Sequence, residues 1–266
     1  MEGSTPAGAI VFRDLTKSYD GFEAVRGVSL TIPRGQICGY LGPNGAGKTT
    51  TVKMATGMLR PSSGSAIIEG HDVTTEPLEA KRLIGLVPET GALYENLTPR
   101  EYLALVGRLY HLDREEAHEK AATFLRLFGI AEFSDRVMAS FSRGMRQKVV
   151  ISAALMHNPS VLFLDEPLSG LDANTVLVFK ELVKDLATQG RTIFYCSHIL
   201  EVVERVCDRV VILNQGRIIA DGKVEDLKDM TKQGSLEDVF SELTSSGDTA
   251  EIVRALSESV TGTRRD

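Results

Sequence analysis

A glycine-rich segment between a predicted strand and a predicted helix has the residue types that bind phosphate. It reads GPNGAGKT from Gly42 to Thr49, the spacing of a phosphate-binding loop. Its glycines let successive backbone N–H groups point toward a bound anion, and the positive end of the helix dipole lies at the same place. Lys48 is expected to reach the β- and γ-phosphates of a nucleotide, and the Thr49 hydroxyl to bind Mg²⁺. The predicted nucleotide-binding residues of this segment are Gly42, Pro43, Asn44, Gly45, Ala46, Gly47, Lys48, Thr49 and Thr50.

A second candidate site follows a short, continuously apolar run, VLFLDEP at 161–167. Such a run between two prolines is typical of a strand that is buried on both faces of a parallel sheet. Asp165 at its end is expected to hold Mg²⁺, and Glu166 to polarise an attacking water. Alone, an Asp-Glu pair after a strand is more often a surface turn. Together with the phosphate loop it predicts hydrolysis of a nucleoside triphosphate.

The elements that must position these residues alternate between strand and helix. The apolar and β-branched segments predict strands, which we place at 9–15, 28–32, 36–41, 65–70, 82–88, 161–165, 192–197 and 209–213. Apolar residues at helical spacing predict helices, which we place at 48–57, 102–110, 117–128, 143–157, 173–188 and 199–207. We therefore expect an α/β fold, in which helices cover a parallel sheet and a helical segment is inserted in the middle of the chain.

The composition is that of an ordinary globular protein. The chain has 266 residues, of which 42% are hydrophobic and 25% charged, and its formal net charge is −6. No apolar run approaches the roughly 20 residues that cross a bilayer, and the first ten residues do not resemble a secretory signal. No basic stripe indicates nucleic-acid binding. Three cysteines without metal-ligand spacing, Cys38, Cys196 and Cys207, are expected to be buried free thiols.

Between the two nucleotide motifs lies FSRGMRQK, residues 141–148. Ser142 is a plausible helix N-cap, which would aim a second helix N-terminus at an anion. In this order, the motifs resemble those of ATP-binding-cassette (ABC) nucleotide-binding domains over nearly the whole chain to about residue 225. The resemblance implies ATP and Mg²⁺ as ligands. It also implies a P-loop NTPase (RecA-like) fold with an N-terminal antiparallel β subdomain and an inserted α-helical subdomain.

The resemblance also implies roles for residues outside the two nucleotide motifs. In the family, the signature that Ser142, Gly144 and Gln147 match contacts the γ-phosphate held by the opposite subunit. Asp172 in SGLD then lies near the dimer seam, and His198 hydrogen-bonds the γ-phosphate or the attacking water. A lone histidine after a strand is usually structural, so the role of His198 depends on motif order.

Tyr19 occupies the position at which the family places an aromatic residue that stacks on adenine. Such a face would contribute about 1 kcal/mol to binding with little discrimination between bases. A core tyrosine is the alternative for this position.

One departure from the family concerns the loop that leads into the helical insertion. The family usually has glutamine there, whereas this sequence reads VPETG and carries Glu89. A carboxylate binds Mg²⁺ at least as well as an amide, so we assign Glu89 a metal and coupling role. Arg143 and Met145 replace small signature residues. Together with SLEDVFSELT at 235–244, these features resemble the bacterial branch that exports drugs, sodium and polysaccharides.

This resemblance implies a nucleotide-binding domain over residues 1–228, with its helical subdomain at about 90–158, and a C-terminal helical extension and flexible tail over 229–266. The implied partners are a separate transmembrane permease and a second nucleotide-binding subunit, identical or homologous, with no nucleic acid. The implied location is the cytoplasmic face of the plasma membrane. Two alternatives stay open at this point, a soluble ABC ATPase that acts on nucleic acid or ribosomes and a small-molecule kinase.

Overall fold

A six-stranded sheet in the order β10-β9-β3-β8-β7-β6 forms the centre of the molecule. The structure is a computed structural model and describes residues 8–90, 93–231 and 235–244. The strands of this sheet are β3 (Ile37–Leu41), β6 (Ile84–Val87), β7 (Val161–Asp165), β8 (Thr192–Cys196), β9 (Arg209–Asn214) and β10 (Arg217–Gly222). Neighbouring strands run parallel except β10, which pairs antiparallel with β9. The carboxyl ends of β3, β7 and β8 therefore meet at one edge of the sheet.

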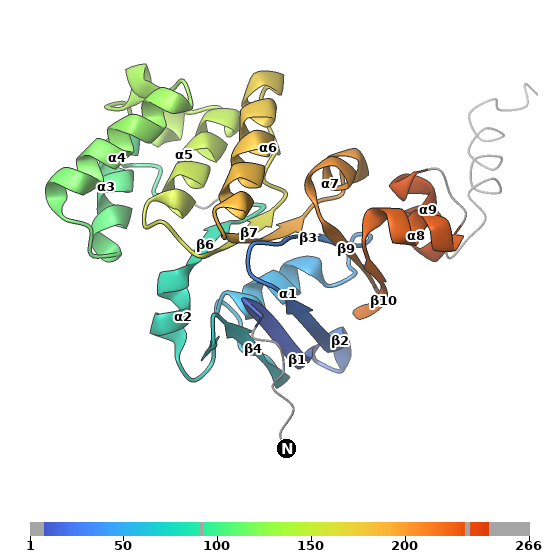
Figure 1. Cartoon of the computed structure of the whole chain (residues 1–266). Helices are drawn as coiled ribbons and strands as arrows, with labels where there is room; N and C mark the ends of the chain where they lie inside the picture. Colours follow the sequence, from blue (N-terminus) through green and yellow to red (C-terminus); the bar gives the residue numbers. More distant parts are fainter. Residues whose placement is uncertain (1–7, 91–92, 232–234, 245–266) are drawn as a thin grey trace, which may run out of the picture.

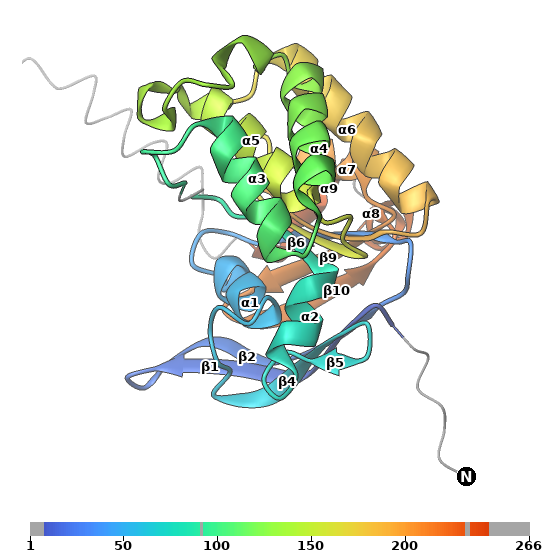
Figure 2. The ribbon, with the colours of Figure 1, turned by 90° about the vertical axis from the view of Figure 1, so that its left-hand side faces the viewer.

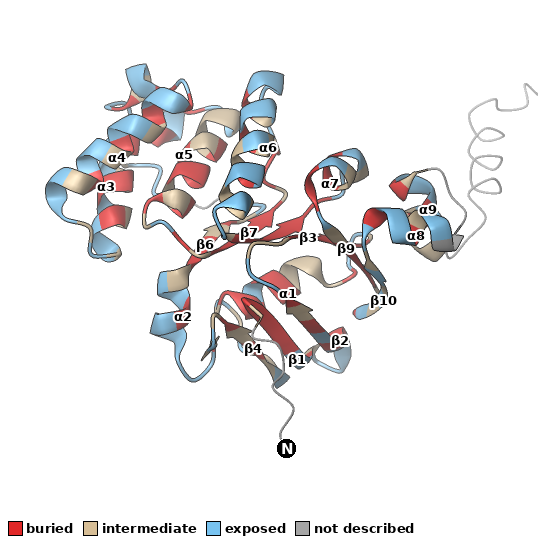
Figure 3. Cartoon of the chain, in the orientation of Figure 1, coloured by how far each residue is buried: buried red, intermediate tan, exposed pale blue. Residues whose placement is uncertain are grey.

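Apolar layers cover both faces of this sheet, as the continuous apolar runs predicted. Every residue of β3, β7 and β8 is buried, and Figure 3 shows these strands between the other layers. Alternate residues point to opposite faces of a strand, so β3 directs Ile37 and Leu41 into one core and Cys38 and Tyr40 into the other. The three cysteines are buried and free, as expected.

An antiparallel sheet and helix α1 (Lys48–Ala55) pack against one face (Figures 1 and 2). The strands of this second sheet are β1 (Ile10–Tyr19), β2 (Phe22–Ile32), β4 (Ser63–Ile68) and β5 (His71–Asp72). Aromatic rings join the two sheets, since Phe194 lies 4.8 Å from Tyr40 and 5.3 Å from Phe163 between ring centroids, and Phe12 packs edge-on against it. The antiparallel sheet thereby places the β1–β2 hairpin beside the helix that follows the phosphate loop.

The opposite side of the central sheet carries the inserted helices α3 (Pro99–Leu109), α4 (Arg114–Leu127) and α5 (Arg143–Leu155). Each begins at a side-chain cap that satisfies free N–H groups of the first turn. Thr98 forms a capping box with Glu101, and Asp113 and Ser142 cap α4 and α5. The helices α6 (Ala173–Thr188) and α7 (Leu200–Val206) complete this layer (Figure 1).

Three helices lie where the sequence analysis placed none or set no bounds. Helix α2 (Pro77–Leu83) replaces the first two residues of the strand predicted at 82–88. It buries only Ala80 and has no side-chain cap, so it lacks the periodic apolar face that would have revealed it. The others are α8 (Val224–Thr231) and α9 (Leu236–Thr244), which pack together at the edge of the sheet (Figure 1).

The expected flexible tail includes 245–266, which lie outside the described residues. The first seven residues, on which part of the expectation about a secretory signal rests, lie outside them too. Among the helices that the structure does describe, none has the length and apolar character needed to cross a membrane.

Candidate nucleotide site

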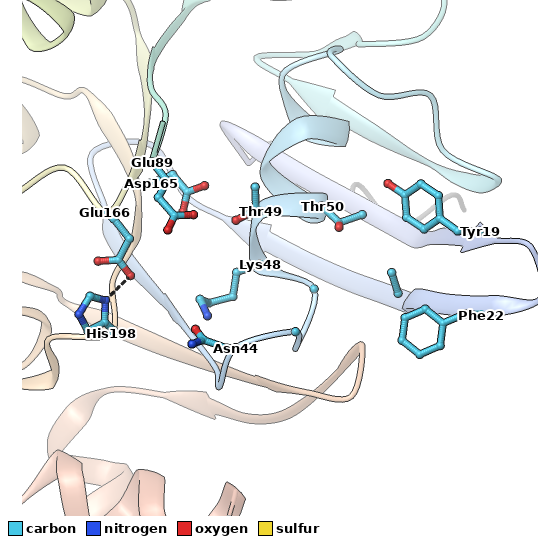
Figure 4. A pocket seen from close by; sticks show the side chains of 13 residues that line it. Tyr19, Phe22, Asn44, Lys48, Thr49, Thr50, Glu89, Asp165, Glu166 and His198 are labelled. Atoms are coloured by element: carbon cyan, nitrogen blue, oxygen red, sulfur yellow. Dashed lines mark ion pairs between the residues drawn. The ribbon is translucent and has the colours of Figure 1, made fainter. Parts of the chain in front are cut away.

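Most of the residues predicted for the phosphate loop line one open cavity of about 630 Å³, whereas Gly42, Pro43 and Ala46 are not among its lining residues. It lies where β3 and β7 end and extends along α1 to the β1–β2 hairpin (Figure 4). Polar side chains gather at one end of the cavity and aromatic side chains at the other (Figure 4). The lining residues are Tyr19, Phe22, Ala24, Asn44, Gly45, Gly47, Lys48, Thr49, Thr50, Glu89, Asp165, Glu166 and His198.

The phosphate loop needs glycine at two positions for different reasons. Gly47 has φ 108°, a backbone conformation that disfavours any Cβ, and a Cβ there would also collide with the Ala24 carbonyl. Gly42 has no space for a Cβ because the Leu213 carbonyl lies against it. The loop is therefore held between the β1–β2 sheet and strand β9, and within it the Ala46 N–H donates to the Pro43 carbonyl at 3.1 Å.

Lys48 is folded back over this loop. Its Nζ donates hydrogen bonds to the carbonyl oxygens of Gly42, at 2.7 Å, and Pro43, at 3.2 Å. These contacts keep the ammonium group inside the cavity, on the side of the carboxylates (Figure 4). A phosphate that enters the loop meets a positive charge that is already in place.

The carboxylate end of the cavity fits a magnesium ion. Asp165 is only 3% exposed, and burial raises the pKa of its carboxyl group to about 6, with Glu89 and Glu166 acting in the same direction. Hydrogen bonding from Thr49 and the charge of Lys48 oppose this rise in pKa. The Asp165, Glu89 and Glu166 carboxylates thus lie near the Thr49 hydroxyl, and Lys48 alone does not balance their negative charge.

The described residues contain no group of three or more His, Cys, Asp or Glu side chains of metal-binding geometry. Mg²⁺ is commonly held by one or two carboxylates, with water and substrate phosphates completing its shell.

Glu166 is held in an unusual backbone conformation beside this carboxylate group. Its φ is 50°, a left-handed value that is uncommon for a residue other than glycine. Its backbone N–H donates to the Cys196 carbonyl at 3.0 Å, and its own carbonyl accepts from Ser169 N–H. The side chain therefore projects toward the carboxyl end of β8, where Oε1 lies 2.8 Å from His198 Nδ1 (Figure 4).

Two aromatic residues form the other end of the cavity. Tyr19 and Phe22 lie opposite each other across the turn of the β1–β2 hairpin and are both exposed. Lys17 Nζ lies 5.2 Å from the Tyr19 ring centroid. Because Tyr19 is exposed, it is not a core tyrosine. An exposed pair of rings at the cavity wall suits a planar base. Phe22 was missed by the sequence analysis; its position across a tight turn from Tyr19 was the signal that could have identified it.

The predicted signature residues do not line this cavity. Ser142 caps α5 as expected, accepting a hydrogen bond from Met145 N–H at 3.2 Å. Gly144 packs so closely on Gly170 that a Cβ would collide with the Gly170 carbonyl. Arg143, which replaces a small signature residue, covers Gly170 with its aliphatic stem and donates to Ser169 Oγ. The start of α5 is thus joined to the segment that follows Glu166.

Two further contacts strengthen this junction. Gln147 is buried and donates from Nε2 to the Pro167 carbonyl at 2.9 Å, so its side chain is engaged within its own chain. Lys148 Nζ lies 3.2 Å from Asp172 Oδ2. Asp172 caps α6, and hydrogen bonds from Thr175, with Lys148 nearby, hold the pKa of its carboxyl group well below the ordinary value.

Comparison with known proteins identifies the family. Residues 25–169 match the sequence profile described as "ABC transporter". The chain belongs to the ABC transporter family. It is 40% identical to the ABC transporter ATP-binding protein NatA of Bacillus subtilis (strain 168), over 82% of this chain and 89% of NatA. It is 38% identical to the daunorubicin/doxorubicin resistance ATP-binding protein DrrA of Streptomyces peucetius, over 84% of this chain and 68% of DrrA.

Solved structures agree with this assignment. An ATP-binding subunit of an ABC transporter superimposes with a TM-score of 0.84 at 33% identity, covering 89% of this chain and 100% of that one. A dimeric ATP-binding cassette in a post-hydrolysis state, bound to ADP and Pi, has a TM-score of 0.76 at 25% identity, covering 80% and 98%. The predicted P-loop NTPase fold, the ABC ATPase activity and the resemblance to the drug-export branch are confirmed. The alternatives of a nucleic-acid ATPase and a kinase are not favoured.

Proposed function

We propose that this ABC ATPase powers an export system by closing and opening a head-to-tail dimer. One observation carries the proposal. Lys48, Thr49, Asp165 and Glu166 share a cavity, whereas the capped N-terminus of α5 at Ser142 lies outside it. A helix N-terminus attracts anions, and one that lies outside its own subunit's nucleotide cavity suits a nucleotide held by a second subunit. A dimeric cassette bound to ADP and Pi is a structural relative.

Each nucleotide would extend from the aromatic end of the cavity to the carboxylate end. The base would lie against Tyr19 and Phe22, and the phosphates would enter the glycine loop next to Lys48. Thr49, Asp165 and Glu89 would hold Mg²⁺ there, and the ion would neutralise phosphate charge. The partner's signature segment would then contact the γ-phosphate through residues equivalent to Ser142 and Gly144, with Asp172 at the dimer seam, while the buried Gln147 would hold this segment in place through Pro167.

Hydrolysis would reopen the dimer. Glu166 would orient a water whose oxygen attacks the γ-phosphorus while the bond to the β-phosphate oxygen breaks, giving ADP and Pi. His198 would hydrogen-bond the γ-phosphate or the water. Because ATP binds the closed dimer better than the open one, ATP shifts the population toward closure, and separable products remove that bias.

The partners follow from the same scheme. The second subunit would be another copy of this chain or a homologous chain, and a separate transmembrane permease would dock on the helical insertion, at about 90–158. The protein would then lie at the cytoplasmic face of the plasma membrane. No nucleic-acid partner is proposed, since the chain has a net charge of −6. We assign residues 1–228 to the nucleotide-binding domain and 229–266 to a C-terminal extension.

The test is Glu166→Gln, which keeps the side-chain shape and removes the negative charge. We expect turnover to fall at least about a hundredfold and an ATP-dependent dimer to accumulate, measured by phosphate release and by size-exclusion chromatography with light scattering. The control is the double variant Lys48→Ala, Glu166→Gln, which should stay monomeric because the phosphate loop loses its cation. If Glu166→Gln hydrolysed ATP normally, or stayed monomeric at high ATP with the permease present, this proposal would be abandoned.

A further inference from the structure

We propose that Ser197 is a positioning residue that holds the Glu166 carboxylate in its reactive orientation. This proposal deepens the function proposed above and rests on the role of Glu166 in it. Ser197 is the residue after β8 and directly precedes His198. It is only 3% exposed, and neither the phosphate loop nor the metal-binding carboxylates explain why a hydroxyl is buried there.

The end of β8 holds Glu166 from three directions. The Cys196 carbonyl accepts the Glu166 backbone N–H at 3.0 Å. His198 Nδ1 lies 2.8 Å from Oε1, and Ser197 Oγ lies 3.3 Å from Oε2. Each carboxylate oxygen therefore has its own side-chain partner. With its backbone in a left-handed conformation, Glu166 depends on these neighbours to keep its geometry.

The surroundings of the Ser197 hydroxyl determine which way it donates. The backbone N–H of Ile199 donates to Ser197 Oγ at 3.1 Å and occupies a lone pair. The single hydroxyl hydrogen is then left for Glu166 Oε2, because an ionised carboxylate can only accept. A short chain of hydrogen bonds thus runs from the Ile199 N–H through the Ser197 hydroxyl to Glu166 Oε2.

The two side-chain partners of Glu166 differ in their freedom to move. The His198 side chain is 73% exposed and the Glu166 side chain 13%, whereas Ser197 is buried. When His198 turns toward a γ-phosphate, Oε1 becomes available to the attacking water. Ser197 then remains as the side-chain contact that fixes the carboxylate plane through Oε2. Ser197 makes and breaks no covalent bond itself; it restricts the rotation of Glu166.

The experiment compares turnover by full-length variants at the Ser197 position. We expect Ser197→Ala to lower kcat about tenfold, the size of one hydrogen bond to a charged group, and to leave the affinity for ATP within about twofold. Ser197→Thr and Ser197→Val form a matched pair, because both add the same bulk and only threonine keeps the hydroxyl. Threonine should turn over faster than valine. Ser152→Ala is the control, since Ser152 is a fully buried serine whose hydroxyl bonds within its own helix; its turnover should not change.

A second measurement separates positioning from a merely structural role. In a Glu166→Gln background, the residual hydrolysis should not fall further on adding Ser197→Ala, because the group that Ser197 orients is already neutral. Equal turnover of the threonine and valine variants, or an additive loss in the double variant, would overturn the proposal for Ser197. Normal hydrolysis by Glu166→Gln alone would instead overturn the proposed role of Glu166, so the two failures are distinguishable.

Discussion

Asp165→Asn should stabilise the nucleotide-free protein while abolishing its magnesium-dependent activity. The buried Asp165 carboxyl has its pKa raised from 3.8 to about 6, first by burial and then by Glu89 and Glu166. Asparagine has nearly the same shape and keeps an oxygen that accepts from Thr49. The substitution removes the buried negative charge of Asp165, which lowers the free energy of unfolding when no metal ion is bound.

The magnitude follows from the shift in pKa. Each unit corresponds to about 1.4 kcal/mol, so a rise from 3.8 to about 6 sets a ceiling of about 3 kcal/mol. Solvent screening and the lost attraction between Asp165 and Lys48 reduce the expected gain to about 1–2 kcal/mol.

The sign of the pH dependence is also determined. Between those two pKa values the native state keeps a proton that the unfolded state has lost, so the free energy of unfolding decreases as the pH rises. The destabilisation of wild type by the ionised Asp165 carboxylate is absent below about pH 4 and complete above about pH 6.

Urea denaturation in EDTA measures this effect at about pH 4.5 and about pH 7.5. The variant should exceed wild type by about 1–2 kcal/mol at the higher pH and by much less at the lower one. Glu89→Gln should give a smaller gain, because it removes one of the carboxylates that raise the pKa of Asp165. Adding Mg²⁺ and ATP should stabilise wild type much more than Asp165→Asn. If Asp165→Asn were no more stable than wild type at either pH, the inference that the Asp165 carboxylate destabilises the metal-free protein would be refuted.

Two other substitutions test the ends of the site. Tyr19→Ala should weaken nucleotide binding about fivefold, and equally for ATP and GTP, because a ring face contributes about 1 kcal/mol without reading the base; titration with fluorescent nucleotides checks this, and unchanged affinity would remove Tyr19 from the site. Gly144→Ala should cost about 1–3 kcal/mol in urea denaturation, because the new Cβ collides with the Gly170 carbonyl. An unchanged unfolding midpoint would show that Gly144 and the Gly170 carbonyl can move apart without loss of stability.

Local patterns in the sequence were sufficient for the main elements. The apolar runs predicted β3, β7 and β8, and the helix predicted at 173–188 has those bounds in the structure. The spacing of Gly42 to Thr49 predicted a phosphate loop, and Ser142 was predicted as an N-cap, because these features depend on neighbours within a few residues. Helix α2 escaped prediction because it buries a single residue, Ala80, and so carries no periodic signal.

The sequence by itself determined which chemical groups this protein carries and in what order, since the motifs are short and contiguous. Only the tertiary structure decided which groups meet. Ser197 and Glu166 are separated by 31 positions, and their contact arises because β7 and β8 are parallel neighbours whose carboxyl ends coincide. Likewise, Phe22 reached the cavity through the register of a hairpin. Spacing along a chain cannot encode such contacts, because they depend on strand order and register, which the packing of the whole core selects.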